Sequence, residues 1–533
     1  MDTLGRLGDE YFRLHFDADP LLASVFGVEG RDSEVPDPSR EAAHAQRGRL
    51  ARVEAELGTV AREGLSTQEK ISHTILGRLL RDEQRILHDG VSEVAVTASI
   101  AGPLAQVVSA VPMTRDAAYV ARLGKLAGYF DGHAERYQQA AADGRFPTEL
   151  GVRQAIAQVD AYLSTPVEQD PLLRDADQKN IIKESVRPAL QRFRTALDEL
   201  PGARGDDKVG LCHVPGGPDA YRTLIAAYTT TEFGPEEIHQ IGLDLVAGLR
   251  EEFKERGGRA LKARSAEETI TRLRDDKELR FTEKGQIVDA VTAALRKAEE
   301  AVPDWFARYD IAPCVVKEMD PAEAENSVLG YYVAPAADGS RPGAHVVNTF
   351  RPESRARFEY EVLAFHESVP GHHLQIAVAQ SRDDLPRFRR FTYFDAHGEG
   401  WGLYTERLTD EMGLYTSELS RLGMVSFDAW RACRLVVDTG MHHFGWSRER
   451  AISYMRDNTA LTETNIANEV DRYIAMPGQA LAYMLGRLRI QQLRERERAA
   501  LGPAFDIRAF HHEVLAHGPL PLDTLEELVA SRW

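Results

Sequence analysis

Apolar residues in the first 300 positions recur at intervals of three and four, which is the spacing of helices that bury one face. One of these segments has both of its ends marked. Ser66 and Glu69 form a capping box at its start, and Gly90 follows its last apolar turn. A longer segment covers Thr114–Asp143, and Pro235 supplies the first-turn residue of a further helix. These patterns predict a mainly helical first half.

The pattern changes between residues 310 and 350. Tyr331–Val333 and Ala344–Thr349 are rich in residues that favour strands, and the turn-rich segment Pro335–Gly343 separates them. We expect a β-hairpin or a small sheet here, followed by helices up to the C-terminus. The sequence thus predicts a mainly α fold with one small β element.

No linker divides the chain of 533 residues. We expect residues 1–300 to form a helical lobe that makes one wall of a cleft, and residues 301–533 to form a second lobe with the hairpin. The two either form separate lobes or share one core as one continuous fold. The hydrophobic content of 43% and the charged content of 28% are typical of a globular protein with a large core.

The charge balance argues against one class of function, the binding of nucleic acids. The chain has 65 Lys and Arg residues against 83 Asp and Glu residues, a formal net charge of −18 at pH 7. We expect no nucleic-acid binding, because affinity for phosphates needs a basic surface. No run of about 18 apolar residues is present, so we expect no membrane span. The N-terminus lacks the pattern of a signal peptide, and we expect a cytoplasmic location.

The strongest chemical signal is the sequence HESVPGHHLQ at His366–Gln375, followed by EGWGLYTE at Glu399–Glu406. Zinc takes imidazole nitrogens and carboxylate oxygens as ligands, and a hydrolytic zinc site keeps one position open for water. The usual peptidase form is H-E-x-x-H on one helix, with the glutamate as general base. That form is absent here, because Pro370 stands four residues after His366.

The next histidines, His372 and His373, follow His366 by six and seven residues. On a straight helix six residues turn by about 600°, and seven residues separate the Cα atoms by roughly 10 Å along the axis. Neither histidine would then meet His366 at one small ion. Proline disrupts a helix and glycine permits unusual backbone angles, so we expect a bulge or tight loop at Val369–Gly371 that returns a later histidine to His366. We favour a metal site over a structural cluster of polar side chains.

Both stretches resemble the bacterial domain-of-unknown-function 885 family, which is regarded as related to the gluzincin metallopeptidases. In gluzincins one helix supplies two histidine ligands and a following helix supplies a glutamate. The resemblance implies His366, His372 and Glu399 as ligands of one Zn²⁺ ion and Glu367 as general base. His373 is the alternative second ligand, or a group that contacts substrate. Another divalent metal is the alternative to zinc.

The resemblance is strongest from about residue 331 to residue 530. It implies a large helical, cleft-shaped, metallopeptidase-like fold, with the small sheet or hairpin beside the metal helix. Glu406 lies seven residues after Glu399 and shares its helix face. It either orients an imidazole N–H or forms a salt bridge on the outside.

A third stretch also resembles the family, through an R-Y pair followed by P-G-Q-A-L-x-Y. It makes Tyr473 and Arg472 the candidates for stabilising an oxyanion, with Tyr483 behind them. The alternative for both tyrosines is packing in the core. Asn348, at the end of the predicted hairpin, is a further candidate for supporting the site or contacting substrate. Met484 stands where the family pattern has lysine, which puts a lysine contact to a substrate carboxylate in doubt.

The sequence therefore predicts a zinc-dependent hydrolase of peptide amide bonds, in which Glu367 takes a proton from a metal-activated water. One alternative keeps the metal and changes the substrate to a small metabolite or biosynthetic intermediate. The other is a catalytically inactive binding protein. Neither the substrate, nor the choice of exo- or endo-cleavage, nor the oligomeric state has a sequence signal.

Overall fold

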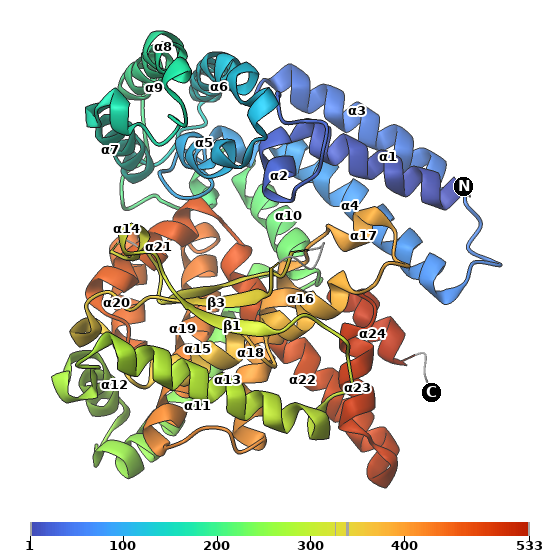
Figure 1. The fold of residues 1–533 in the computed structure, drawn as a ribbon, viewed down its shortest axis with the longest axis vertical. Coiled ribbons are helices and arrows are strands. Elements are labelled where there is room, and N and C mark those ends of the chain that lie inside the picture. Colours follow the sequence, from blue (N-terminus) through green and yellow to red (C-terminus); the bar gives the residue numbers. More distant parts are fainter. Residues whose placement is uncertain (1–2, 326, 337–340, 531–533) are drawn as a thin grey trace.

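The computed structural model describes residues 3–325, 327–336 and 341–530, and helices make up most of it (Figure 1). The local helix signals are confirmed. The Ser66 hydroxyl accepts a hydrogen bond from the Glu69 N–H, the Glu69 carboxylate accepts one from the Ser66 N–H, and Gly90 ends the helix with a φ of 59°. The helices of this first part are α1 (Thr3–Ala18), α2 (Pro20–Val25), α3 (Arg40–Leu57), α4 (Thr67–Asp89), α5 (Pro103–Ala110), α6 (Asp116–Ala142), α7 (Glu149–Ser164), α8 (Lys179–Ile181) and α9 (Arg187–Asp198).

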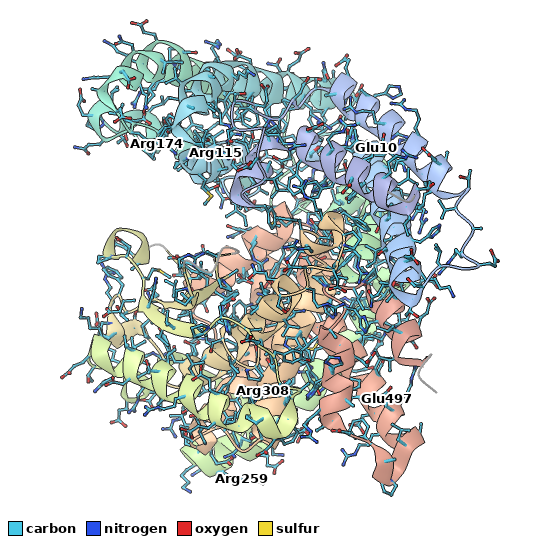
Figure 2. All side chains as sticks on the ribbon, turned by 45° about the vertical axis from the view of Figure 1, so that its right-hand side comes forward. Glu10, Arg115, Arg174, Arg259, Arg308 and Glu497 are labelled. Atoms are coloured by element: carbon cyan, nitrogen blue, oxygen red, sulfur yellow. The ribbon has the colours of Figure 1, made fainter. Side chains whose placement is uncertain are left out.

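The next four helices pack against the C-terminal half of the chain rather than against α5–α9. They are α10 (Gly217–Thr229), α11 (Pro235–Leu261), α12 (Ala266–Asp275) and α13 (Lys284–Trp305). α11 lies along α19 (Glu418–His442), and both belong to one large core that also includes α10 and α13. A separate hydrophobic cluster lies within residues 21–197, the part of the chain that carries Arg115 and Arg174 at the top of Figure 2. The packing therefore does not follow the expected division at residue 300, and the role of residues 1–300 as a cleft wall stays a prediction.

The predicted hairpin is present, and a third strand joins it. β2 (Gly330–Val333) pairs antiparallel with β3 (Gly343–Val347), and β1 (Cys314–Glu318) pairs parallel with the other edge of β3. The sequence analysis missed β1, because five residues that end in two charged ones give a weak strand signal. Residues 337–340 of the expected loop lie outside the described residues. The sheet contacts the two helices that follow it, α15 and α16, as the sequence analysis expected.

The helices from residue 359 onward carry the candidate site. After the short α14 (Pro321–Ala324), they are α15 (Glu359–Glu367), α16 (His372–Gln380), α17 (Arg387–Arg390), α18 (Asp395–Glu411), α19, α20 (Arg448–Asn458), α21 (Glu463–Ala475), α22 (Ala482–Leu501), α23 (Ile507–Leu515) and α24 (Leu522–Ala530). α18 and α22 are in backbone contact. A Cβ on Gly400 would lie 2.5 Å from the Cα of Gly486, so a side chain there would force the two helices apart.

Candidate metal centre

A tight turn separates α15 from α16, where the sequence predicted one. α15 ends at Glu367, the Val369–Pro370 peptide bond is cis, and α16 begins at His372. The turn requires glycine at position 371, because a Cβ on Gly371 would lie 1.9 Å from the carbonyl oxygen of His366. The centroids of the His366 and His372 rings are consequently only 4.6 Å apart.

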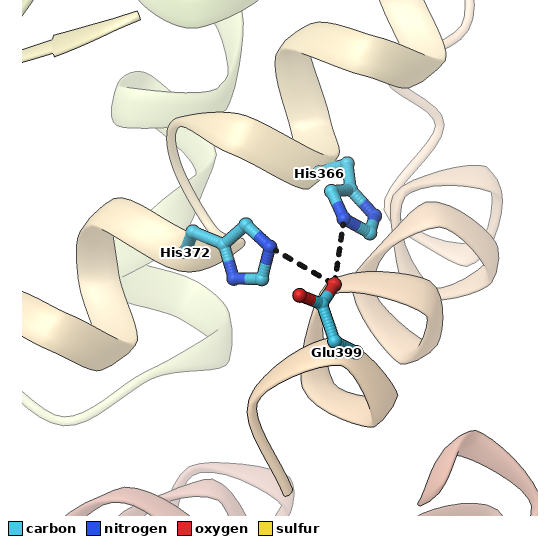
Figure 3. Close-up of side chains that lie close together, drawn as sticks. All are labelled: His366, His372 and Glu399. Carbon is cyan, nitrogen blue, oxygen red and sulfur yellow. Dashed lines mark ion pairs between the residues drawn. The ribbon is translucent and has the colours of Figure 1, made fainter. Parts of the chain in front are cut away.

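His366, His372 and Glu399 converge on one point (Figure 3). Glu399 Oε2 lies 3.7 Å from His366 Nε2 and 3.5 Å from His372 Nε2. A tetrahedral zinc site with its usual bond lengths places ligand atoms roughly 3.4 Å apart, so these three donors fit one ion and leave a fourth position open. Among the residues that the structure describes, no other group of His, Cys, Asp and Glu side chains converges in this way.

Glu406 fixes the orientation of the first ligand. Its Oε1 lies 2.8 Å from His366 Nδ1, and its side chain is fully buried. This hydrogen bond places a proton on Nδ1 and leaves Nε2, the atom that faces Glu399, available to a metal. Of the two roles that the sequence left open for Glu406, the structure therefore favours orientation of an imidazole.

Tyr393 fixes the carboxylate ligand, and the sequence analysis missed it. Its hydroxyl donates a hydrogen bond of 3.2 Å to Glu399 Oε1. Two glycines of α18 leave space for these contacts. A Cβ on Gly398 would lie 2.2 Å from the Tyr393 hydroxyl, and one on Gly402 would lie 2.6 Å from His366 Cε1. In the sequence, the glycines around Glu399 were the only sign of a close contact at this position. They did not show that Tyr393 makes it.

His373 points away from the candidate metal centre. Its Nδ1 lies 3.0 Å from the Tyr332 hydroxyl, and its Nε2 lies 3.0 Å from the carbonyl oxygen of Ala312. It also lines a cavity of about 1010 Å³ between α13, α16 and α23. The geometry therefore brings His372, and not His373, to His366.

Glu367 lies beside the three ligands and is half-buried. Burial raises the pKa of its carboxyl above the ordinary value, while the neighbouring His366 and His372 act in the opposite direction. Its carboxylate makes no hydrogen bond or ion pair with any described residue. A carboxylate with a raised pKa and no fixed partner is suited to accepting and returning a proton.

Arg472 and Tyr473 belong to a buried network, and their expected role in stabilising an oxyanion stays a prediction. The Tyr473 hydroxyl donates to Glu469 and accepts a hydrogen bond of 2.9 Å from Arg434 Nε. Arg472 donates to Glu469 at 3.1 Å and to Gln479 Oε1 at 2.9 Å. The donors that would bind an oxyanion are thus already engaged. The sequence did not reveal this, because Arg434 lies far from the motif along the chain.

Tyr483 is better placed than Tyr473. Burial is the main cause that raises its pKa to about 12, and the negative charge of Glu399 is the next. Its ring also stacks on the Arg434 guanidinium, with 4.4 Å between the Cζ atom and the ring centroid. Tyr483 is therefore close to this arginine and within the electrostatic influence of Glu399.

Asn348 supports a loop instead of the metal centre. Its amide donates hydrogen bonds of 2.7 Å to the Ala324 carbonyl and 3.0 Å to the Val328 carbonyl, and its Oδ1 accepts one from the Phe350 N–H. These bonds use the polar atoms that a substrate would need. Asn348 therefore has a structural role in this loop, and its expected role at the site stays a prediction.

We expect the Glu406→Gln substitution to weaken zinc binding by about 10- to 100-fold, because the imidazole of His366 loses its charged partner. Competition with a chromogenic chelator measures the affinity. Glu411→Gln is the matched control, since Glu411 is on the same helix and pairs with Arg494 on the outside. Equal zinc affinity in the two variants would contradict the role assigned to Glu406.

The metal-free protein is expected to lose stability as the pH rises from about 6.5 to about 9. Burial alone would lower the pKa of His366, but hydrogen bonds with Glu399 and Glu406 raise it to about 9, from 6.5. A raised histidine pKa stabilises the fold below the unfolded-state value, and the contribution disappears as the pH passes the folded-state value. Zinc must displace this proton, so its affinity should rise over the same range.

Thermal unfolding of chelator-treated protein and zinc titrations at several pH values test this expectation. In Glu406→Gln both pH dependences should move to lower pH, because one of the groups that raise the His366 pKa is gone. Unchanged profiles in that variant would show that another group titrates.

Comparison with known proteins identifies the family and the fold. The family model described as "Bacterial protein of unknown function (DUF885)" matches residues 20–529. A candidate lipoprotein from Colwellia psychrerythraea is 26% identical, with a TM-score of 0.91 over 99% of this chain and 98% of that one. A candidate lipoprotein of unknown function from Shewanella oneidensis has the same fold, with 18% identity and a TM-score of 0.79 over 99% of this chain and 100% of that one. No curated protein matches the chain.

The cytoplasmic location stays a prediction. The description as a lipoprotein applies to the two structural neighbours and not to this chain. None of the helices in the described part of the chain combines the length and the apolar content that crossing a membrane requires.

Proposed function

We propose, for a chain that belongs to the bacterial DUF885 family of unknown function, that it is a zinc-dependent hydrolase of peptide amide bonds. One observation carries the proposal. His366, His372 and Glu399 converge with the spacing of a three-ligand site, next to the unpaired carboxylate of Glu367. The resemblance of both motifs to gluzincin metallopeptidases supports it.

The donor set of two imidazoles and one carboxylate suits zinc, and another divalent metal is the alternative. Glu406 and Tyr393 hold two of the three ligands in place before any metal arrives. When bound, zinc lowers the pKa of a water molecule and polarises the amide carbonyl.

In this proposal Glu367 transfers the protons, and Tyr483 stabilises the charge that develops on the substrate. Glu367 takes the proton of the attacking water and passes it to the leaving amine, which needs a carboxyl that both accepts and returns a proton. Tyr483, beside Glu399, supplies a hydroxyl for the charge that develops on the carbonyl oxygen. Arg472 and Tyr473 position Gln479 and Glu469 instead of touching the substrate.

Mass spectrometry of a mixed peptide pool incubated with the zinc-loaded protein tests the proposal, with Glu367→Gln as the inactive control. Cleavage by the wild type alone would support it, and the positions of the cuts would show which terminus the enzyme reads. The absence of cleavage by either protein would overturn peptide hydrolysis. The functions to test next would then be amide hydrolysis of a small molecule and binding without catalytic activity.

A further inference from the structure

Two buried arginines of α19 have donors without acceptors. The Nε and Nη1 atoms of Arg431 and the Nη1 atom of Arg434 are buried and have no hydrogen-bond partner among the described residues. The two side chains are only 6% and 4% exposed. Leaving a buried charged donor without an acceptor costs free energy. Seven other arginines among the described residues also have one such atom each, but Arg431 is the only described arginine with two.

Aromatic rings hold both guanidinium groups in a stack. The Cζ atom of Arg431 lies 4.2 Å from the centroid of the Trp430 ring and 4.5 Å from that of Phe427. The Cζ atom of Arg434 lies 4.6 Å from the Trp430 centroid and 4.4 Å from that of Tyr483. Of the N–H groups in this stack, those on Nε and Nη1 of Arg431 and on Nη1 of Arg434 remain for an acceptor, because Nε and Nη2 of Arg434 already donate to Tyr473 and Glu469. A planar, pre-oriented fork of this kind matches a carboxylate.

Arg431 has no close carboxylate partner of its own, whereas Arg434 has one. Glu469 accepts hydrogen bonds from both Arg434 and Arg472, at 3.0 and 3.1 Å. The carboxylate nearest to Arg431 belongs to Glu406, at 4.0 Å, and that oxygen is already bound to His366. Of Arg431, Arg434 and Arg472, Arg431 therefore has the weakest ion pair.

The stack borders the candidate metal centre. Glu406 lies between Arg431 and the His366 ligand, and Tyr483 is close to Arg434 and within the electrostatic influence of Glu399. An anion bound to these arginines would therefore lie close to the amide that the proposed reaction cleaves.

We propose that Arg431 and Arg434 bind a carboxylate of the substrate, so that this chain acts on amides that lie close to a carboxylate group. The inference rests on the proposed function, because it names the substrate class of that same site. A free C-terminus and an acidic side chain both offer this group, and the experiment must separate them.

Isothermal titration calorimetry on the zinc-loaded Glu367→Gln protein measures binding without turnover. The probes are acetyl-pentaalanine with a free carboxylate, its C-terminal amide, and the amide with glutamate as its last residue. We expect a peptide with a carboxylate to bind at least about tenfold more tightly than the plain amide. A preference for the first peptide indicates recognition of a C-terminus, and a preference for the third indicates an acidic side chain.

Adding Arg431→Gln should remove most of that preference. Arg421→Gln is the matched control, because Arg421 is on the same helix and pairs with Asp410 and Glu418 away from the stack. If Arg431→Gln does not fold, Arg431→Lys keeps the charge without the planar fork and should also reduce the preference. Equal binding of the three peptides, binding of none of them, or an unchanged preference in the Arg431 variant would overturn the inference.

The two proposals fail in different ways. A wild type that cleaves no peptide, while Glu367→Gln keeps an Arg431-dependent carboxylate preference, would reject hydrolysis and keep the anion site. Cleavage of peptides without any carboxylate preference would do the reverse.

Discussion

Replacement of Glu367 by glutamine is expected to slow peptide hydrolysis by about 10³-fold while zinc binding stays unchanged. Glutamine has the shape of glutamate but cannot accept the proton of the attacking water. Glu367 is not one of the three converging ligands, and its carboxylate has no partner among the described residues, so the substitution removes the base and nothing else. Turnover of a peptide that the wild type cleaves, together with the zinc content of both proteins, measures the two effects separately.

Glu361→Gln is the matched control for this experiment. Glu361 is on the same helix, α15, and its carboxylate binds Thr416 on the outer side. The control should keep its activity. If Glu367→Gln retained more than about a tenth of the wild-type rate, or lost its zinc, the assignment of Glu367 as general base would be wrong.

The neighbouring substitutions His372→Gln and His373→Gln are expected to have opposite effects. Loss of His372 removes one of the three candidate ligands. Loss of a group that only supports a ligand lowers metal affinity by about 10- to 100-fold, so zinc affinity should fall further than that in the His372 variant. Loss of His373 should leave zinc affinity within severalfold. It should instead lower the free energy of unfolding by about 1–3 kcal/mol, because the Tyr332 hydroxyl and the Ala312 carbonyl lose a buried partner.

Zinc titration and denaturant unfolding of the two variants test this pair directly. The two histidines are adjacent in the chain and both are buried, so each variant controls for the general effect of the other. Zinc loss in the His373 variant with zinc retention in the His372 variant would reverse the assignment of the second ligand.

The sequence predicted those features that depend on neighbours along the chain. The capping box at Ser66 and the αL glycine at position 90 are local hydrogen-bonding devices, and both form as expected. The turn between α15 and α16 was also predictable, because proline and glycine limit the backbone whatever surrounds them. The convergence of His366, His372 and Glu399 followed from this turn and from the family resemblance.

The features that were missed depend on contacts between distant segments. Arg472 and Tyr473 carry suitable groups, but Arg434 and Glu469 engage them from another helix and from one turn earlier. Tyr393 reaches Glu399 only because the segment before α18 folds back over Gly398. The periodicity and spacing of residues in the sequence do not predict such a contact, because it depends on how the helices pack and not on residues that are close in the chain.

The backbone contact between Gly400 and Gly486 has a consequence for recognising related proteins. α18, which carries Glu399, contacts the histidine-bearing helices α15 and α16 and also contacts α22, where Gly400 and Gly486 touch. Gly400 is therefore needed for the short distance between α18 and α22, whereas Glu399 is needed as a candidate metal ligand. A relative that keeps both histidines and the glutamate but has a larger residue at either glycine should hold its helices further apart. Such a chain would keep the three candidate ligands in its sequence, but the glutamate on α18 would be displaced from the two histidines.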